Sequence, residues 1–459
     1  MSGLFGSLSM AARALDAQRY GLDVAGQNIA NVNTPGYSRR QVTLSALPPD
    51  EFLSPGNGVE ITGLRATRDM RLERRLQQER PAEQRELAIS QSLAIVETIV
   101  GKPGESIDAA LSTFFDSAGR LAADPTSATV RQEVATQGAG LASEFRDMAS
   151  RLAQARRDTD ASVRDGVTQV NALAQRIAKL NASFGAASGV EGATETLKDE
   201  IGVALKSLSS LVNISTITRA DGGVDVTFGS GHPLVLDDNV YSLDLTSGPP
   251  NGFARLQSAG TDVTSEVTGG SIGGFLQTRD VLMPGYADKL DTLAYTVVTQ
   301  VNAVHQTGYD MHGATGAAFF TPLGSAAGAA SAISISAGIA ADPSTIAAGT
   351  TATPGDNGVA RQFANLRDAR VMTGGTATFA DSWGTFIYQV GADSRAASDE
   401  HGSRAEIVSQ MELMRAQVSG VSLDEEAANM MKFQRAYEAN ARFFQAIDST
   451  LEALMSLGR

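Results

Sequence analysis

The four histidines are the side chains in this sequence best suited to bind a transition metal. They are His232, His305, His312 and His401. Only His305 and His312 are near each other, and they lack the i, i+4 spacing that places two ligands on one face of a helix. The sequence has no cysteine, which excludes disulfides, Cys-ligated zinc and thiol nucleophiles. We therefore expect no metal site.

Two other clusters could bind small ions. Asp237, Asp238 and Asn239 carry oxygen ligands that suit a cation, but the same residue types are typical of a solvated turn. The string from Gly269 to Gly274 lacks the Lys-Ser/Thr pair of a phosphate-binding loop, and we interpret it as a hinge before a helix. The sequence predicts a protein that is not an enzyme and uses no cofactor.

Composition limits both the architecture and the partners. A length of 459 residues predicts two to four domains, and 46 glycines with 6% aromatic residues favour elongated, lightly packed modules. A net charge of -14 should repel phosphate backbones, so we expect no nucleic acid partner. The N-terminus lacks the features of a cleaved signal peptide, and the longest uncharged stretch, 311–341, is dominated by small residues. We expect no membrane insertion.

Both ends of the chain carry the pattern of an amphipathic helix. Near the N-terminus a seven-residue repeat places Leu8, Leu15, Leu22 and Ile29 at one position of a coiled-coil seam. The last 38 residues begin at Ser422, which forms a capping-box pattern with Glu425, and continue with apolar residues at three- and four-residue steps. Two interpretations remain open: the helices pair only with each other, or their remaining apolar surface also packs against neighbouring copies.

Between the ends, helical and strand patterns alternate. Short strands are expected at 42–44 and 59–64, and a helical block at 69–211 with breaks at Pro81, Pro103 and Asp124-Pro125. Alternating, turn-rich sequence follows from Asn213. Helix is expected again at 272–304 and from Val359 to Val418, with short strands near 333–335.

These patterns predict an elongated multidomain α+β protein that is mainly α. Residues 1–40 and 420–459 form a terminal coiled-coil assembly domain. Residues 41–212, 271–312 and 356–419 form a discontinuous helical-bundle domain with a β hairpin at 41–68, and residues 213–270, with 313–355 as a possible addition, form an inserted β-rich outer domain.

The string after the first helix is the most informative in the chain. Pro35 disfavours helix at Thr34, and Gly36 supplies a turn. This string, together with Leu423–Ala441 near the C-terminus, resembles the signature of the flagellar axial proteins, which are rod, hook and hook-associated subunits. The matching residues are Asn28, Ala30, Asn31, Asn33, Thr34, Pro35, Gly36, Tyr37 and Arg39. The bundle segments around Phe114-Phe115 and Asp124-Pro125 are similar to the hook-associated branch, which forms the junction between hook and filament.

The resemblance implies a structural subunit that assembles with itself. Members are exported unfolded by the flagellar type III export apparatus without a cleaved signal, and a chaperone covers the C-terminal helix before export. It implies hook protein on one side, the next hook-associated protein on the other, and a final location in the extracellular flagellum after a transient cytoplasmic stage. We expect subunit packing through Leu8, Leu15, Leu22, Ile29, Phe433, Tyr437, Phe444 and Leu451.

Three alternatives remain open at this point. A hook or distal-rod axial protein would share both terminal strings. A flagellum-borne adhesin would use the β-rich domain as its binding module. A wall-cleaving hydrolase on an axial scaffold would need a catalytic acid in a pocket, and the sequence offers no candidate.

Overall fold

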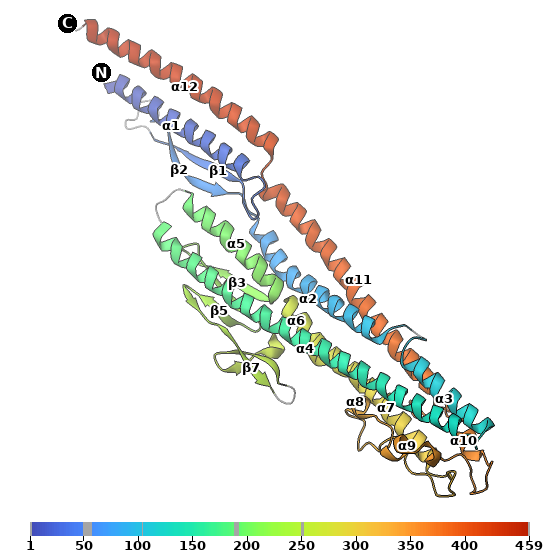
Figure 1. Ribbon diagram of the computed structural model, residues 1–459. Coiled ribbons are helices and arrows are strands. Elements are labelled where there is room, and N and C mark those ends of the chain that lie inside the picture. The colour runs from blue at the N-terminus through green and yellow to red at the C-terminus, as the bar shows by residue number, and fades with distance from the viewer. Residues whose placement is uncertain (1, 49–56, 103, 188–191, 249–251, 458–459) are drawn as a thin grey trace.

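The computed structural model describes residues 2–48, 57–102, 104–187, 192–248 and 252–457. The chain is a long, mainly helical rod with its first and last helices paired at one tip and small antiparallel sheets along its sides (Figure 1). This arrangement confirms the predicted α+β, mainly α fold class. Among the described helices, none combines the length and apolar character that a membrane span needs.

The terminal layer contains two long helices and one hairpin. Helices α1 (Ser2–Ala30) and α12 (Leu423–Leu457) lie side by side and run in opposite directions (Figure 1). Strands β1 (Arg40–Ala46) and β2 (Val59–Ala66) form an antiparallel hairpin against α1, which confirms the two strands predicted there.

One glycine allows α1 and α12 to approach closely. Gly21 is buried, and a Cβ atom at this position would lie only 2.6 Å from Cε1 of the Phe433 ring. Real Cβ atoms do not come this close to a ring carbon, so the interhelical distance at this point depends on the absence of a side chain.

The bundle is built from both halves of the chain, and α2 and α11 pair along much of its length (Figure 1). Asp69 caps the start of α2 by accepting from the N–H groups of Arg71 and Leu72, and Thr378 and Asp381 form a capping box at the start of α11. Helix α4, with 60 residues, reaches about 90 Å. The bundle helices are α2 (Met70–Val100), α3 (Ile107–Ala123), α4 (Ala128–Ala187), α5 (Ala193–Leu211), α6 (Gly270–Gln277), a π-helical turn (Thr278–Leu282), α7 (Met283–His305), α10 (Gly358–Asn365) and α11 (Phe379–Ser419).

The helix break predicted at Pro81 is wrong. Helix α2 continues through Pro81, whose ring is buried. A proline inside a helix costs about 3 kcal/mol through the lost hydrogen bond and a backbone clash. Packing of α2 against α11 and α6 offsets this cost, since residues on either side of the proline, such as Leu76 and Ile89, are buried.

The break predicted at Asp124-Pro125 is confirmed, because α3 ends at Ala123 and α4 starts at Ala128. The predicted break at Pro103 lies outside the described residues.

An aromatic cluster forms the core at the far end of the bundle. Phe114 lies 5.2 Å from Phe363 and 5.5 Å from Phe319, measured between ring centroids. The segment 313–355 packs into this core through buried residues that include Ile333 and Ile346. It does not join the second core, in the β-rich region, although the sequence analysis gave it as a possible addition to that domain. Its regular elements are α8 (Ala329–Ala332), α9 (Ala337–Ala341) and the 3₁₀ turn η3 (Pro343–Thr345). The strand expected near 333–335 is reduced to a single β-bridge between Phe320 and Ile335.

The β-rich region packs on α4 and α5 with a second core. Asn181 of α4 bonds both backbone groups of Val224, and Asn171 does the same with Leu243, which fixes each sheet to the helix. One sheet has the order β3-β4-β5-β6 and the other β7-β8-β9. The strands are β3 (Ile214–Thr218), β4 (Val224–Phe228), β5 (His232–Leu236), β6 (Asn239–Val240), β7 (Leu243–Gly248), β8 (Phe253–Ser258) and β9 (Thr261–Asp262), followed by the 3₁₀ turn η1 (Thr264–Glu266).

Two predicted loops can be located in this region. Gly270 has a φ of 72°, and a Cβ atom there would collide with the backbone of Leu211, so this position of the glycine string requires glycine. Asp237 lies between β5 and β6, where its carboxylate pairs with Arg219. Within the described residues, no group of three or more His, Cys, Asp or Glu side chains could hold a metal ion.

His305 gives the bundle a predicted pH dependence. Its buried imidazole donates from Nδ1 to the carbonyl of Ala317 at 2.5 Å and accepts at Nε2 from the N–H of Ala347 at 2.8 Å. Burial lowers the pKa of His305 below its ordinary value of 6.5. The unfolded chain therefore binds a proton before the folded chain does, so stability is fully present above about pH 6.5 and is lost as the pH falls below it.

The measurement is urea unfolding at about pH 7.5 and about pH 5. We expect a lower free energy of unfolding at the acidic pH. His305→Gln should be less stable at both pH values but less sensitive to pH, whereas His312→Gln, at an exposed position, should keep the wild-type dependence. Equal pH dependence in all three proteins would contradict the role of His305.

Candidate assembly site at the base of the terminal helices

Asn28 is the centre of a buried hydrogen-bond network at the end of α1. Its Nδ2 donates to the carbonyl of Arg40 at 2.9 Å and to Oε2 of Glu426 at 3.1 Å. Its Oδ1 accepts from the hydroxyl of Tyr37 at 2.8 Å and from the N–H of Arg40 at 3.0 Å. One side chain that is 1% exposed therefore joins α1, the following turn, β1 and α12.

Arg39 fastens α12 to the same point. Its Nε donates to Oε1 of Glu426 at 2.7 Å, and its Nη1 to Oε2 of Glu425 at 2.6 Å. The backbone N–H of Arg39 donates to the carbonyl of Ser419 at the end of α11. The Glu426 side chain is 3% exposed, so its charge depends on Arg39 and Asn28 for compensation.

The predicted capping box at Ser422 is only half formed. Oγ of Ser422 accepts from the N–H of Glu425 at 3.4 Å. The Glu425 carboxylate pairs instead with Arg39, because a guanidinium offers a stronger partner than a neutral backbone N–H.

A second ion-pair group ties the hairpin to α5. Arg68 pairs with Glu195 at 2.6 Å and with Asp199 at 2.8 Å, and Nη2 of Arg40 lies 3.5 Å from Oδ2 of Asp199. Burial alone would raise the pKa of Glu195, but the hydrogen bond from Lys198 and the charge of Arg68 hold it below its ordinary value. The carboxylate therefore stays ionised and the cluster stays paired.

The turn between α1 and β1 requires Gly36. Its φ is 82°, and a Cβ atom there would collide with the Val203 side chain of α5. Tyr37 stacks under the Arg40 guanidinium at 5.0 Å, and burial raises the pKa of its hydroxyl, which remains a neutral donor to Asn28. We call the group formed by Asn28, Tyr37, Arg39, Arg40, Arg68, Glu195, Asp199, Glu425 and Glu426 the joint, since it links the terminal layer to the bundle.

The two terminal helices bury small residues against each other and the hairpin, and leave larger ones partly open. Ala11, Ala17, Val24 and Ala25 of α1 are buried. The heptad residues Leu8, Leu15, Leu22 and Ile29 are only half-buried. On α12, Phe444 and Leu451 are half-buried, and residues on both flanks of the seam are exposed, namely Leu423, Met430, Met431, Tyr437, Phe443, Leu454 and Met455.

Known proteins and family models match this chain over nearly its whole length. Residues 93–320 match a family model described as the flagellar hook-associated protein FlgK helical domain. Residues 8–37 match the flagella basal body rod protein model, and residues 417–457 match the flagellar basal body rod FlgEFG protein C-terminal model. Flagellar hook-associated protein 1 of Bacillus subtilis is 26% identical over 500 residues, covering 99% of each chain.

The chain belongs to the flagellar hook-associated protein 1 family. The protein of the same name from Salmonella typhimurium is 22% identical over 552 residues, covering 98% of this chain and 99% of the relative. A solved structure of the flagellar hook junction protein FlgK from Burkholderia pseudomallei superimposes with a TM-score of 0.68 at 16% identity, over 75% of this chain and 100% of that one, which shows a shared fold. As a member of this family, the chain is a structural component of the bacterial flagellum.

Within this family member, the residues of the predicted axial motif fall into two groups. Asn28, Gly36, Tyr37 and Arg39 form or shape the joint. Asn31 is bonded locally, since its Nδ2 donates to the carbonyl of Gln27 and its Oδ1 accepts from Thr34. The remaining motif residues, Ala30, Asn33, Thr34 and Pro35, are exposed.

The predicted packing residues are also divided by the structure. Phe433 faces Gly21 of its own chain, so its ring already has an intramolecular partner. Tyr437 is 38% exposed, while Leu8, Leu15, Leu22, Ile29, Phe444 and Leu451 remain half-buried. Contacts between copies through these residues stay a prediction.

Sequence reasoning missed several members of the joint. It did not connect Arg40 and Arg68 of the hairpin with Glu195 and Asp199 of α5, because α2, α3 and α4 separate these segments in the sequence. Glu426 lies within the C-terminal string Leu423–Ala441, but only the folded chain shows that it is buried against Asn28.

Proposed function

We propose that this chain forms part of the junction between hook and filament. Its terminal helices pack side by side with those of neighbouring copies, and the bundle and β-rich region lie outside that layer. The observation that carries the proposal is the full-length relationship to hook-associated protein 1, including the model match in the bundle. The structure supports it with a terminal layer whose large apolar residues are only partly covered within one chain.

The partners follow from the same position. Hook protein would lie on one side and the next hook-associated protein on the other. The exposed apolar residues of α12, such as Met431 and Phe443, would need cover before assembly, which supports a chaperone on this helix and export through the type III apparatus. The protein would pass through the cytoplasm and finish in the extracellular flagellum in a structural role.

Deleting the gene and imaging the cells by electron microscopy tests this role. We expect complete hooks that carry no filaments. Cells without hooks would indicate a hook or rod subunit instead, although the full-length relatives do not favour that alternative. Normal filaments with a loss of adhesion would indicate the adhesin role.

A polar substitution in the seam should separate assembly from folding. Leu22 is half-buried on α1, so Leu22→Asp should place a carboxylate where a neighbouring copy packs and should stop incorporation. The bundle does not include this residue and should keep its thermal unfolding midpoint. Motility and electron microscopy measure the first effect, and circular dichroism the second.

Ile217→Asp provides the matched control. Ile217 is 68% exposed on β3 of the β-rich region, and the change of residue type is similar. This variant should assemble normally. Normal flagella in the Leu22→Asp strain would contradict the seam assignment.

A further inference from the structure

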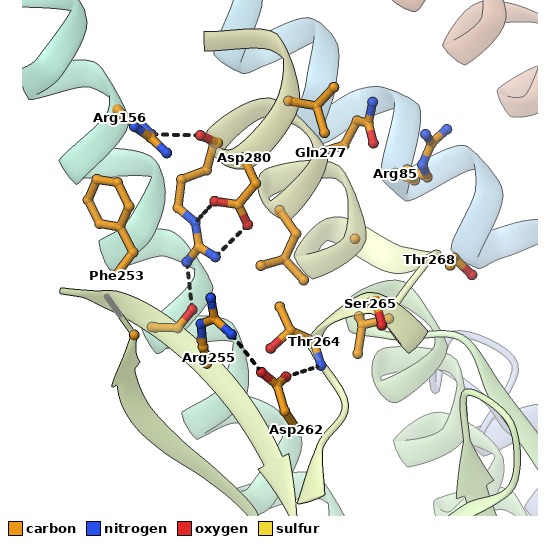
Figure 2. Close-up of a pocket in the computed structure, with 17 residues that line it drawn as sticks. Arg85, Arg156, Phe253, Arg255, Asp262, Thr264, Ser265, Thr268, Gln277 and Asp280 are labelled. Carbon is orange, nitrogen blue, oxygen red and sulfur yellow. Dashed lines mark hydrogen bonds and ion pairs between the residues drawn. The ribbon is translucent and has the colours of Figure 1, made fainter. Parts of the chain in front are cut away.

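A cavity of about 740 Å³ lies between α4, the π-helical turn after α6, and strands β7 to β9. Figure 2 shows Arg156 and Phe253 on one side of it and Arg85 and Thr268 on the opposite side. Four arginines and two aspartates line the cavity: Arg85, Arg156, Arg255, Arg279, Asp262 and Asp280. The cavity therefore concentrates guanidinium groups in a chain whose net charge is -14.

The carboxylates of the cavity are already paired. Asp262 accepts from Arg255 at 3.1 Å, and Asp280 accepts from Nε and Nη2 of Arg279 at 2.9 and 2.7 Å (Figure 2). Arg279, whose side chain is 2% exposed, also bonds Asp160 at 2.6 Å and is therefore compensated. Arg85 pairs with the adjacent Glu86.

Arg156 is the exception. Within the described part of the chain, it forms no ion pair with a carboxylate. Its guanidinium lies 4.6 Å from the centroid of the Phe253 ring, and its Nε donates to the carbonyl of Arg279 at 2.7 Å. These two contacts hold the guanidinium in place while they use only one of its five N–H groups.

Arg156 lies in a partly desolvated site beside a second guanidinium. The Arg279 guanidinium lies 5.6 Å from the same Phe253 ring, so two cations flank one aromatic side chain. Burial lowers the pKa of Arg156, and the charge of Arg279 acts in the same direction, whereas the carboxylates of Asp280 and Asp288 oppose it. A bound anion would offset the desolvation of this guanidinium and accept from the N–H groups that have no partner among the contacts described.

We propose that this cavity binds a small multivalent oxyanion, a ligand with phosphate or carboxylate groups, with Arg156 as its main contact. The volume is ample for such a ligand. The guanidinium groups of Arg255 and Arg85 also line the cavity, and neutral hydrogen-bonding groups are available from Ser265, Thr268 and Gln277 (Figure 2). The site lies at the contact between the β-rich region and the bundle, so an occupant would bridge the two.

Isothermal titration calorimetry of the full chain with pyrophosphate and with citrate, at low salt, tests the proposal. We expect saturable binding of at least one probe with one site per chain, weakened strongly in about 1 M salt, where the screening length is about 3 Å. Arg156→Gln should reduce affinity at least tenfold. Arg157→Gln, the neighbouring residue on α4, whose guanidinium bonds only Gln154 among the contacts described, should bind within about twofold of wild type.

A second variant should raise the affinity for the anion, and the folded structure should tolerate it. Asp262→Asn removes the carboxylate that holds Arg255, in a pair that is half exposed, so it should increase affinity several-fold. Binding of pyrophosphate alone would assign the ligand class to phosphates, and of citrate alone to carboxylates. No saturable binding of either probe, or equal affinity in Arg156→Gln and Arg157→Gln, would overturn the proposal.

Discussion

Replacing Asn28 by leucine should detach the terminal layer from the bundle. The substitution leaves the N–H and carbonyl of Arg40, the Tyr37 hydroxyl and one oxygen of Glu426 without their partner in a buried site. Each buried polar group that loses its hydrogen bond costs about 1–3 kcal/mol, so the joint should lose about 3–5 kcal/mol. Amide hydrogen exchange should then be faster by about a hundredfold or more in β1 and at the start of α12.

The motif supplies its own control for this experiment. Asn33 belongs to the same string but is exposed, so Asn33→Leu should leave exchange in β1 and α12 unchanged. The core of the bundle, which is distant from the joint, should exchange normally in both variants. Similar behaviour of the two leucine variants would show that Asn28 does not have the structural role described here.

Gly21→Ala should weaken the pairing of α1 with α12, although alanine is the better helix former. The new Cβ atom would lie 2.6 Å from the Phe433 ring, and such overpacking costs about 1–3 kcal/mol. The higher helix propensity of alanine stabilises α1 by about 1 kcal/mol, so the net effect of the substitution should be destabilising. Amide hydrogen exchange along α1 that is faster than in the wild-type protein would measure this destabilisation.

Gly26→Ala on the same helix should instead stabilise α1. No atom lies within 4 Å of the added Cβ atom at Gly26, so only the gain in helix propensity, about 0.5–1 kcal/mol, remains. Phe433→Leu should partly rescue Gly21→Ala, with a coupling free energy of about 1 kcal/mol in a double-mutant cycle. Additive effects of the two substitutions would contradict the contact.

Local patterns predicted much of the fold because they depend on residues close in sequence. The heptad repeat of Leu8, Leu15 and Leu22 predicted α1, and the apolar and turn residues around 42–64 predicted the β1–β2 hairpin. The same reasoning failed at Pro81, where the packing of α2 outweighs a local preference against helix. It also proposed strand near 333–335, where the chain instead packs into the aromatic core through short helices and one β-bridge.

The cavity and the joint could not be predicted in this way. Arg156 and Phe253 lie far apart in sequence, and nothing in their local patterns indicates that the guanidinium stacks on the ring. The seam residues were recognised as apolar, yet only the structure shows that Phe433 faces Gly21 while Tyr437 remains exposed.

The sequence by itself determined the terminal helices and the turn at Pro35 and Gly36, because periodicity and turn chemistry are properties of neighbouring residues. Its two terminal strings also carried the resemblance to flagellar axial proteins. The tertiary structure alone decided what the motif does within the chain. Asn28 and Glu426 are 398 residues apart, and spacing along a chain does not specify which distant segments meet. Their contact is decided by the packing of α1, α12 and the hairpin, which buries both side chains and leaves each as a partner for the other.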